Sequence, residues 1–383
     1  MALDMLLKDV SSVNHKNTNP QRKLSFCFIS ETSRADKPLL DPSVRYRCYH
    51  PAEYLLSKGH SCTVVSAEHF YTSPVLNHDV YVFHRPNAGR TGFKEIVNYL
   101  SRQGTSLIAD YDDLIFGDSA IALGSSAVKN GTLNPKTAVD VFRNNLQAML
   151  MFDKVTVSTV PLSEYVREYN PRASTHVVPN FIPSSVLNLH RDLKTANRKR
   201  PRTTIGYFAG TKSHDKDLPV VESVLHRVLS ENPNFQLFVV GPVLLPKSLT
   251  SLPNVAVTSV VNYLRLPGLM STCSTVIAPL EDSSFNSCKS RVKFLEAALA
   301  GCRLVASPIP DMTGFGDGAI ALANSLDDWY FHLSNPLSQT CQKKLANDNL
   351  EILHPVSNGS FIEPIPASFV YESADLCRTS SCS

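Results

Sequence analysis

The feature that most constrains the fold is an alternation of short apolar runs with amphipathic segments, which breaks once and then restarts. In the first half, runs such as LSFCFIS, DVYVFHRP and TSLIADYDD alternate with helix-like segments such as FKEIVNYLSRQG. Buried strands separated by helices are typical of a parallel sheet covered on both faces. This half of the sequence therefore predicts one Rossmann-like α/β lobe.

The alternation breaks at 190–202, HRDLKTANRKRPR, which is polar and basic. The same plan then returns with TTIGYFAG, FQLFVVG, STVIAPL and CRLVASPI. A chain of 383 residues is also too long for one ordinary core and suits two domains. We therefore predict an α/β protein of two Rossmann-like lobes facing each other across a cleft, where open α/β sheets bind ligands.

The pattern also predicts the limits of the domains. The expected segments are a flexible N-terminus at 1–22, an N-terminal Rossmann-like domain at 23–189, a basic linker at 190–202, a C-terminal Rossmann-like domain at 203–353 and a tail at 354–383.

Composition and charge exclude several classes of protein. With 43% hydrophobic and 19% charged residues, the chain has the composition of a soluble globular protein. The net charge of +3 gives no indication of nucleic-acid binding by the chain as a whole. Nine cysteines lie at irregular spacings without a CxxC pair, which predicts reduced thiols in a cytosolic protein and no structural metal.

The N-terminal sequence does not favour secretion. Asp4 and Lys8 interrupt a short apolar stretch, and a polar run follows where a signal peptide needs a longer apolar core. No stretch approaches the roughly 20 apolar residues that span a bilayer. We expect a cytoplasmic protein. The basic linker suits peripheral contact with the anionic inner face of the membrane, and the alternative is an ordinary solvated charge run.

The most informative stretch is FNSCKSRVKFLEAALAGCRLVASP, at 285–308, in which a basic loop opens a helix. The first amides of a helix have no partner within it and the helix dipole is positive there, so a diphosphate could dock at this end. The alternative is a solvated basic turn. The residues that would hold the diphosphate are Lys289, Ser290, Arg291, Val292 and Lys293.

This stretch resembles glycosyltransferase family four and its GT-B relatives, whose last large motif ends LEAxAxGxPVxAS; here it is LEAALAGCRLVAS. The resemblance implies that Glu296 binds the ribose hydroxyls of a nucleotide-diphosphate sugar, and that the helix start holds the diphosphate. A carboxylate suits this role because its two oxygens accept from adjacent hydroxyls.

The sequence departs from the family at one position. The usual pattern is Glu-x7-Glu, and counting back from Glu296 places Cys288 at the first carboxylate. In relatives that carboxylate contacts the donor sugar, so the departure concerns the sugar and not the nucleotide. A similar subgroup carries FNxxKSxxKxLE, in which Asn286, Lys289 and Ser290 would replace the usual glycine-rich loop.

A second constellation, GYFAGTKSHDKDL, follows the first strand of the C-terminal lobe. A strand, a small-residue turn and a helix bring backbone closest to a phosphate. In relatives a basic pair here grips the diphosphate, and cations that meet the departing diphosphate lower the barrier. Asp215 or Asp217 is expected to cap the next helix. The donor-side candidates here are Gly210, Lys212, His214 and Lys216.

Two strand ends in the first lobe carry polar groups. His84 ends DVYVFHRP, where some family members have a His-x-Pro near the reacting sugar; the alternative is a structural histidine. Asp110, Asp112 and Asp113 follow a later strand. An Asp-x-Asp run suggests the metal site of the other main glycosyltransferase fold, GT-A. The second lobe argues against GT-A, so we expect acceptor contacts or a helix cap here, and no metal.

The first helix of the N-terminal lobe opens with RYRCYH. GT-B relatives often place acceptor-binding residues here, and the run is basic enough to meet a phosphate-bearing acceptor. The alternative is an ordinary solvated helix start. The acceptor-side candidates are Arg45, Arg47 and His50.

By resemblance, the N-terminal lobe binds the acceptor and the C-terminal lobe binds the donor, with His84, Lys216 and Lys289 as catalytic residues. The expected reaction transfers a sugar with retention, without metal or cofactor, to a glycan or lipid-linked acceptor in bacterial surface polysaccharide synthesis, such as lipopolysaccharide or capsule. One alternative is a nucleotide-sugar epimerase or hydrolase, which needs further carboxylates. Another is a non-catalytic scaffold or binding subunit, for which Cys288 is the best support.

Overall fold

The structure is a computed structural model, and it describes residues 23–32, 34, 36–188, 203–210, 216–313, 320–353, 365–366 and 368–369. The predicted N-terminal segment, the basic linker, most of the tail, Lys212, His214 and Asp215 lie outside the described residues.

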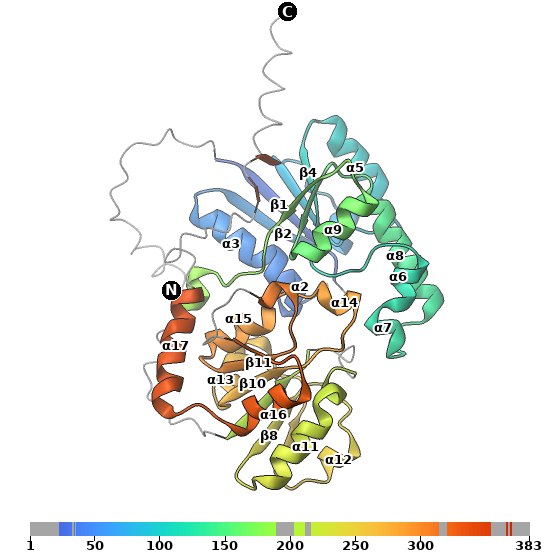
Figure 1. Ribbon diagram of the computed structural model, residues 1–383. Coiled ribbons are helices and arrows are strands. Elements are labelled where there is room, and N and C mark those ends of the chain that lie inside the picture. The colour runs from blue at the N-terminus through green and yellow to red at the C-terminus, as the bar shows by residue number, and fades with distance from the viewer. Residues whose placement is uncertain are drawn as a thin grey trace, which may run out of the picture.

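The first lobe is a six-stranded parallel sheet in the order β2-β1-β3-β4-β5-β6 (Figure 1). Alternate residues of strand β1, next to the edge strand β2, enter different cores. Phe26 and Phe28 pack with the first helices, while Cys27 and Ile29 pack on the opposite face. Both faces of the sheet are therefore covered, as its apolar strands predicted. The strands are β1 (Ser25–Ser30), β2 (Ser61–Ser66), β3 (Val80–His84), β4 (Ser106–Tyr111), β5 (Lys154–Val157) and β6 (Ser174–Val177).

Helices connect these strands on both sides of the sheet. They are α2 (Pro42–Val44), α3 (His50–Ser57), α4 (Ala67–Thr72), α5 (Phe93–Arg102), α6 (Ser119–Gly124), α7 (Ser126–Lys129), α8 (Pro135–Met149) and α9 (Val160–Tyr169).

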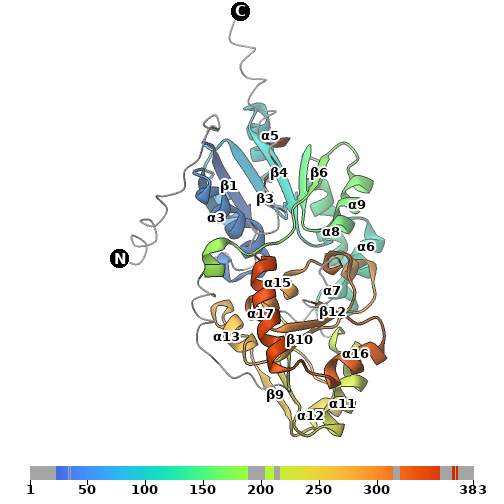
Figure 2. The same ribbon diagram turned by 60° about the vertical axis from the view of Figure 1, so that its left-hand side comes forward.

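The second lobe has its own six-stranded parallel sheet, in the order β12-β11-β10-β7-β8-β9. Figure 2 shows the two lobes stacked along the long axis of the molecule. The prediction of two Rossmann-like lobes is thus confirmed. The strands are β7 (Thr204–Phe208), β8 (Gln236–Val240), β9 (Val255–Thr258), β10 (Thr275–Ala278), β11 (Arg303–Ala306) and β12 (Ile320–Leu322). The main helices are α11 (Glu222–Glu231), α12 (Lys247–Thr250), α13 (Leu266–Met270), α14 (Ser284–Ser287), α15 (Val292–Leu299), α16 (Leu326–Ser334) and α17 (Gln339–Leu353).

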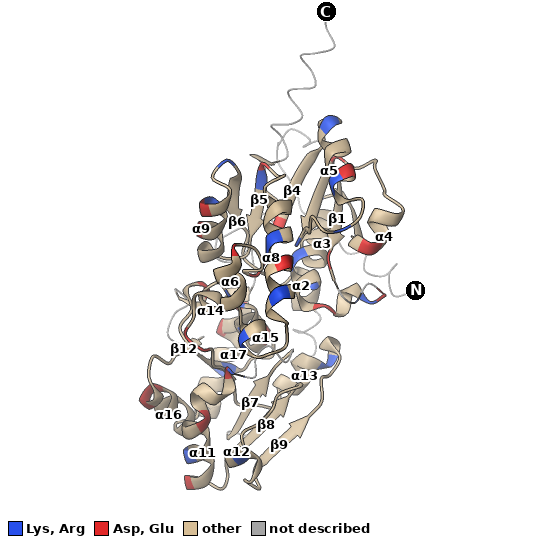
Figure 3. Ribbon diagram, turned by 90° about the vertical axis from the view of Figure 1, so that its right-hand side faces the viewer, with Lys and Arg blue, Asp and Glu red and all other residues tan. Residues whose placement is uncertain are grey.

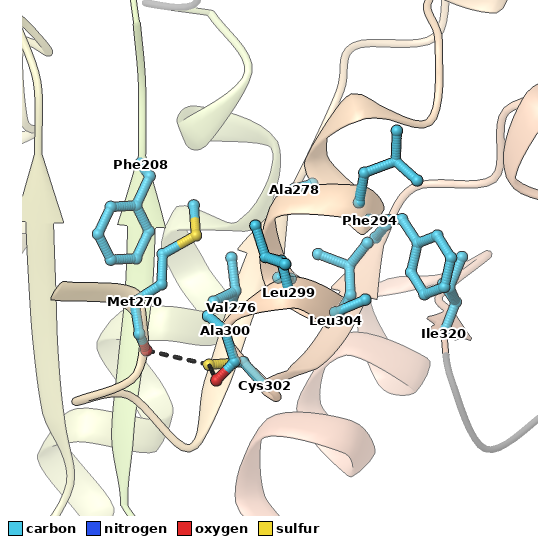
Figure 4. Close-up of a cluster of buried hydrophobic side chains, with 14 of the residues drawn as sticks. Phe208, Met270, Val276, Ala278, Phe294, Leu299, Ala300, Cys302, Leu304 and Ile320 are labelled. Atoms are coloured by element: carbon cyan, nitrogen blue, oxygen red, sulfur yellow. Dashed lines mark hydrogen bonds between the residues drawn. The ribbon is translucent and has the colours of Figure 1, made fainter. Parts of the chain in front are cut away.

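Helix α15 is held by its apolar face. Figure 4 shows Phe294 and Leu299 among the buried side chains of strands β7, β10 and β11, in the same cluster as Met270 of α13, with Phe294 beside Ile320. The helix ends where the sequence predicted, because Gly301 takes a φ of 66° and its amide turns back to Ala298, a conformation that glycine adopts at little cost. This packing fixes the direction of α15. The loop before its N-terminus therefore points toward the first lobe.

One turn of π-helix, Arg45–Tyr49, joins α2 to α3 in the first lobe. Pro51 lies near the start of α3, where its ring would clash with the carbonyl four residues earlier and where it has no N–H to donate. A wider π turn accommodates such a break. It also leaves both Arg45 and Arg47 buried, although a regular solvated helix start would expose them.

Part of the C-terminal tail returns to the first lobe. Ile365 and Phe369 are buried in the core beneath β1 and α3. The carbonyl oxygen of Phe369 accepts hydrogen bonds from Ser106 Oγ at 2.7 Å and Lys154 Nζ at 2.6 Å. The described part of the tail therefore packs against the first lobe. No helix among the described residues is long and apolar enough to cross a membrane.

Candidate functional site

A cavity of about 510 Å³ lies where the two lobes meet. Its wall includes Glu31 after β1, Arg85 after β3 and Asp113 after β4, and it is closed from the second lobe by Phe285 and Lys289. Strands β1 and β3 are neighbours in the sheet, but the chain leaves them in opposite directions to β2 and β4. Such a switch point at the carboxyl ends of parallel strands is where open α/β sheets bind ligands.

The second lobe has its switch point between β7 and β10. The two segments singled out as donor-binding begin at the ends of these strands, at Gly210 after β7 and at Asn286 after β10. A hydrogen bond from the Glu281 amide to Asp217 Oδ1, 3.1 Å, ties the two loops together. Asp217 makes no side-chain cap bond to the next helix, and Asp215, the other residue expected to cap it, lies outside the described residues.

Of the other candidates in the turn after β7, the structure describes Lys216 and Gly210. Lys216 is exposed, and Gly210 is exposed with open space where a Cβ would lie. Gly210 is thus not required for steric reasons. Gly241, which the sequence analysis did not single out, has a φ of 126°, and a Cβ there would lie 2.0 Å from the Ala209 carbonyl oxygen. The close backbone approach at this strand end depends on Gly241.

The loop before α15 reaches into the first lobe. Lys289 Nζ lies 3.0 and 3.1 Å from the two carboxylate oxygens of Asp113. Ser290 Oγ accepts a hydrogen bond from Asn180 Nδ2 at 2.9 Å. The buried Asn286 lines the cavity and donates to the Glu281 carbonyl oxygen at 2.8 Å. The predicted donor loop therefore also makes contacts between the lobes.

All three cations around the α15 N-terminus have carboxylate partners. Besides the Lys289 pair, Arg291 makes side-chain and backbone hydrogen bonds to Asp311, and Lys293 Nζ lies 3.0 Å from Glu296 Oε2. The sequence argument took an anionic ligand as the reason for this positive charge. The structure supplies carboxylates instead, so a diphosphate bound here would compete with them.

Cys288 lies in the core of the first lobe. It is fully buried among residues of that lobe, and its carbonyl oxygen accepts from Thr159 Oγ1 at 3.0 Å. Burial raises the pKa of its thiol to about 12, so it is not a nucleophilic thiolate at neutral pH. At the position where the family resemblance predicts a carboxylate, this chain therefore has a buried thiol that packs in the core of the first lobe.

We expect Cys288→Ala to lower the free energy of unfolding by about 1 kcal/mol, because it removes a buried sulfur and leaves a small cavity. Activity should stay within about threefold of wild type, since no reacting group is lost. Thermal denaturation and steady-state kinetics check both points, with Cys341→Ala, an exposed cysteine, as the control. A loss of activity without a loss of stability would contradict the assignment.

Arg47 and Asp110, both predicted to bind the acceptor, bind each other. Arg47 Nε lies 2.9 Å from Asp110 Oδ2, and its terminal nitrogen lies 2.5 Å from Asp110 Oδ1. The other terminal nitrogen donates to the Val178 carbonyl and to Asn180 Oδ1, and Thr156 donates to Asp110. Both side chains are 3% exposed. In this structure neither lines the cavity, and the pair joins α2 and α3 to the sheet.

His84 belongs to a hydrogen-bonded cluster at the end of β3. Ser43 Oγ lies 2.5 Å from Asp112 Oδ2 and 2.7 Å from His84 Nε2. Because a carboxylate only accepts, Ser43 donates to Asp112 and is free to accept from His84 Nε2–H. His84 Nδ1 is buried without a hydrogen-bond partner. The geometry thus places a ring hydrogen on Nε2, where Ser43 accepts it.

Arg85 completes this cluster. Its Nε lies 2.7 Å from Asp112 Oδ1. Burial alone would raise the pKa of Asp112, but Arg85 and His84 outweigh burial and hold that pKa well below its usual range. Among the described residues other than glycine, Arg85 alone has a positive φ, 52°. Backbone strain of this kind gathers at ligand sites.

Arg45 and His50 also contact other residues of the protein. The Arg45 guanidinium lies 4.1 Å from the centre of the Tyr263 ring of the second lobe, a cation–π contact between lobes. His50 Nδ1 is 3.0 Å from the Phe181 carbonyl oxygen, and the ring packs on Tyr46. Of the six predicted acceptor residues, only Asp113 lines the cavity.

The buried His50 predicts a pH dependence of stability. Burial lowers its pKa from 6.5 to about 4, so between these values the unfolded chain binds a proton that the folded chain does not. Stability should therefore fall by about 2–3 kcal/mol as the pH drops from 6.5 to 4. His50→Gln should remove this part of the dependence in urea unfolding, whereas His226→Gln, at an exposed site, should retain it.

Sequence reasoning missed several residues of this site. Glu31, Ser43, Arg85 and Asn87 were not assigned a role. The available signal was position, because Glu31, Arg85 and Asn87 follow two apolar strands that prove to be neighbours. The Asp-x-Asp run does not converge on one point, since Asp110, Asp112 and Asp113 turn to Arg47, Ser43 and Lys289. No group of three potential metal ligands occurs among the described residues.

Comparison with known proteins yields structural similarity only. No family model and no curated protein sequence matches the chain. An alpha-glucosyltransferase in complex with UDP is similar with a TM-score of 0.58 at 9% identity, covering 94% of this chain and 100% of that one. A sucrose-phosphate synthase from Thermosynechococcus elongatus has a TM-score of 0.55 at 11% identity, covering 93% and 99%. A trehalose 6-phosphate synthase from Burkholderia multivorans has a TM-score of 0.53 at 11% identity, covering 91% and 85%.

Proposed function

With the GT-B fold as the premise, we propose that this protein is a glycosyltransferase that moves a sugar from a nucleotide-diphosphate donor held by the second lobe to an acceptor held by the first. The proposal includes retention at the anomeric carbon, no metal or cofactor, and a glycan or lipid-linked acceptor in bacterial surface polysaccharide or glycoconjugate synthesis. The similar solved proteins support it, because their names describe transfer or synthesis involving sugars and one holds UDP.

The observation that carries the proposal is that a loop from the switch point of the second lobe closes a cavity at the switch point of the first lobe. The ends of β1 and β3 line the cavity, and the loop after β10 closes it with Lys289 and Asn286. Transfer between two substrates requires that they be held within reach of each other, and opposed strand ends provide that arrangement.

The proposed roles of the site residues are those that the family resemblance implies, and Lys212 and His214 lie outside the described residues. Glu296, 13% exposed and paired with Lys293, would accept from ribose hydroxyls, with Gly210, Lys212 and His214 on the β7 side of the donor. Lys289 and Lys216 would stabilise negative charge on the departing diphosphate. By resemblance His84 would act near the reacting sugar from the first lobe; in the structure its side chain is buried, is held by Ser43 and does not line the cavity.

The two alternatives make different predictions. An epimerase or hydrolase needs further carboxylates at the donor sugar, and the buried Cys288 takes one such position. Product release from a donor without acceptor would favour that class. A binding subunit would bind a nucleoside diphosphate and show no turnover with any donor.

The first experiment is a panel of UDP-, GDP- and ADP-sugars with the full-length protein. We expect a thermal shift with one nucleoside diphosphate and a roughly tenfold weaker affinity in Glu296→Gln, because a neutral amide loses a charge-assisted hydrogen bond to a hydroxyl. Glu231→Gln is the matched control, since Glu231 ends α11 in the second lobe, paired with Arg227. Absence of any nucleoside diphosphate binding would reject the proposed function.

A further inference from the structure

The charged residues of the cavity wall do not form a cationic site. The lining contains three carboxylates, of Glu31, Asp41 and Asp113, and two cations, Arg85 and Lys289, which gives a formal charge of −1. Figure 3 shows acidic and basic residues interspersed along the first lobe around α2 and α8. Beyond the donor diphosphate proposed for Lys289, the described part of the cavity wall thus carries no surplus of positive charge to meet a phosphate on the acceptor.

Both of these cations, Arg85 and Lys289, also form ion pairs with carboxylates of the protein. Lys289 Nζ lies 3.0 Å from Asp113 Oδ2, and Arg85 Nε lies 2.7 Å from Asp112 Oδ1 with a second nitrogen 4.0 Å from Asp113. A phosphate monoester carries about two negative charges and would have to displace these carboxylates or lie beside them. Repulsion between these carboxylates and a phosphate would therefore disfavour a phosphorylated ligand.

The basic helix start does not supply the missing charge. Arg45 lies against the ring of Tyr263, and Arg47 is held by Asp110 in a pair that is 3% exposed. Neither side chain lines the cavity. The sequence expectation of a phosphate-bearing acceptor rested on these two arginines.

The remaining lining suits an uncharged sugar. Asp41 accepts from Thr32 Oγ1 at 2.7 Å and from the Ser43 amide at 3.0 Å, and a carboxylate has further lone pairs for sugar hydroxyls. Phe142 and Phe285 bring aromatic rings to the wall. A sugar ring presents hydroxyl donors at its edge and C–H groups on its face, which match these two kinds of wall.

We propose that the part of the acceptor that enters this cavity is an uncharged, hydroxyl-rich sugar and not a sugar phosphate. This inference rests on the proposed function and specifies its acceptor. Asp113 is then a specificity-determining residue, because its carboxylate neutralises Lys289 and repels an anionic substituent.

The test titrates full-length protein with methyl glucoside, methyl galactoside and methyl mannoside, and with the matching hexose 6-phosphates, by saturation-transfer NMR without donor. We expect at least one neutral glycoside to bind, and its matched phosphate to bind about tenfold more weakly or not at all. Added salt should leave the affinity of the neutral glycoside unchanged. Equal or tighter binding of the phosphate overturns the inference, and so does binding of neither class.

The second part of the test uses a variant that removes one negative charge from the cavity wall. Asp113→Asn frees Lys289 and removes the repulsion, so the bound hexose 6-phosphate should gain about tenfold in affinity while the neutral glycoside changes by less. Asp140→Asn on the exposed face of α8 is the control. No gain in phosphate affinity by a folded Asp113→Asn protein counts against the inference. Nucleoside diphosphate binding is measured separately, so failure here is distinguishable from failure of the proposed function.

Discussion

Asp110→Ala is expected to lower the free energy of unfolding by about 3–5 kcal/mol, because it leaves the Arg47 guanidinium buried without its charge partner. The measurement is urea unfolding followed by circular dichroism, with the melting temperature as a second readout. The matched control is Asp140→Ala, whose partner Arg143 is 58% exposed, and which should cost less than about 1 kcal/mol.

A double variant separates the charge effect from lost packing. Replacing both members of the pair, as Arg47→Met with Asp110→Leu, removes the unpaired charge and should recover part of the lost stability. If Asp110→Ala instead unfolds like the wild type and weakens acceptor binding, the carboxylate serves the acceptor, as the sequence suggested, and the structural assignment is wrong.

Lys289→Met is expected to lower kcat/KM by about 100- to 1000-fold, the typical loss on removing one group that stabilises charge in a transition state. The reason is that the loop after β10 presents this cation at the cleft, where it would meet the departing diphosphate. Lys247→Met, an exposed lysine of the same lobe, should have no effect. The measurement is steady-state kinetics with the donor found in the panel.

Lys289 also joins the two lobes through Asp113, so its two roles must be separated. Asp113→Asn breaks the same ion pair but keeps the cation. If the lysine acts on the diphosphate, Asp113→Asn should retain kcat within about tenfold while Lys289→Met does not. Equal losses in both variants would show that the ion pair between the lobes matters and that the cation has no separate role in the chemistry.

Much of the fold could be predicted because its signals are local. Apolar runs of strand length, helical periodicity and one basic break predicted two parallel-sheet lobes, and Gly301 marked the end of α15 correctly. These features depend on residues within a few positions of each other. The π turn before α3 escaped prediction, because Pro51 signals a break without saying how the helix accommodates it.

The sequence placed candidate residues after strands but could not give the partners of their side chains. Among the described candidates, Gly210 follows β7 and Asn286 lies in the loop after β10, and these two strands are neighbours in the sheet. However, Arg47 and Asp110 were predicted to bind a ligand because the sequence does not show that their charges pair with each other. They are 63 residues apart in the chain, and only the sheet order of the first lobe brings them together.

The sequence by itself thus determined the two lobes, the strand ends at which the cleft forms, and the helix that begins after Arg291. Only the tertiary structure decided what those residues face. It turns Cys288 into the core of the opposite lobe and sets Lys289 against Asp113, which lies 176 residues away. The physical reason is that secondary structure follows from local periodicity, whereas the partner of a charge or thiol is set by packing between distant segments.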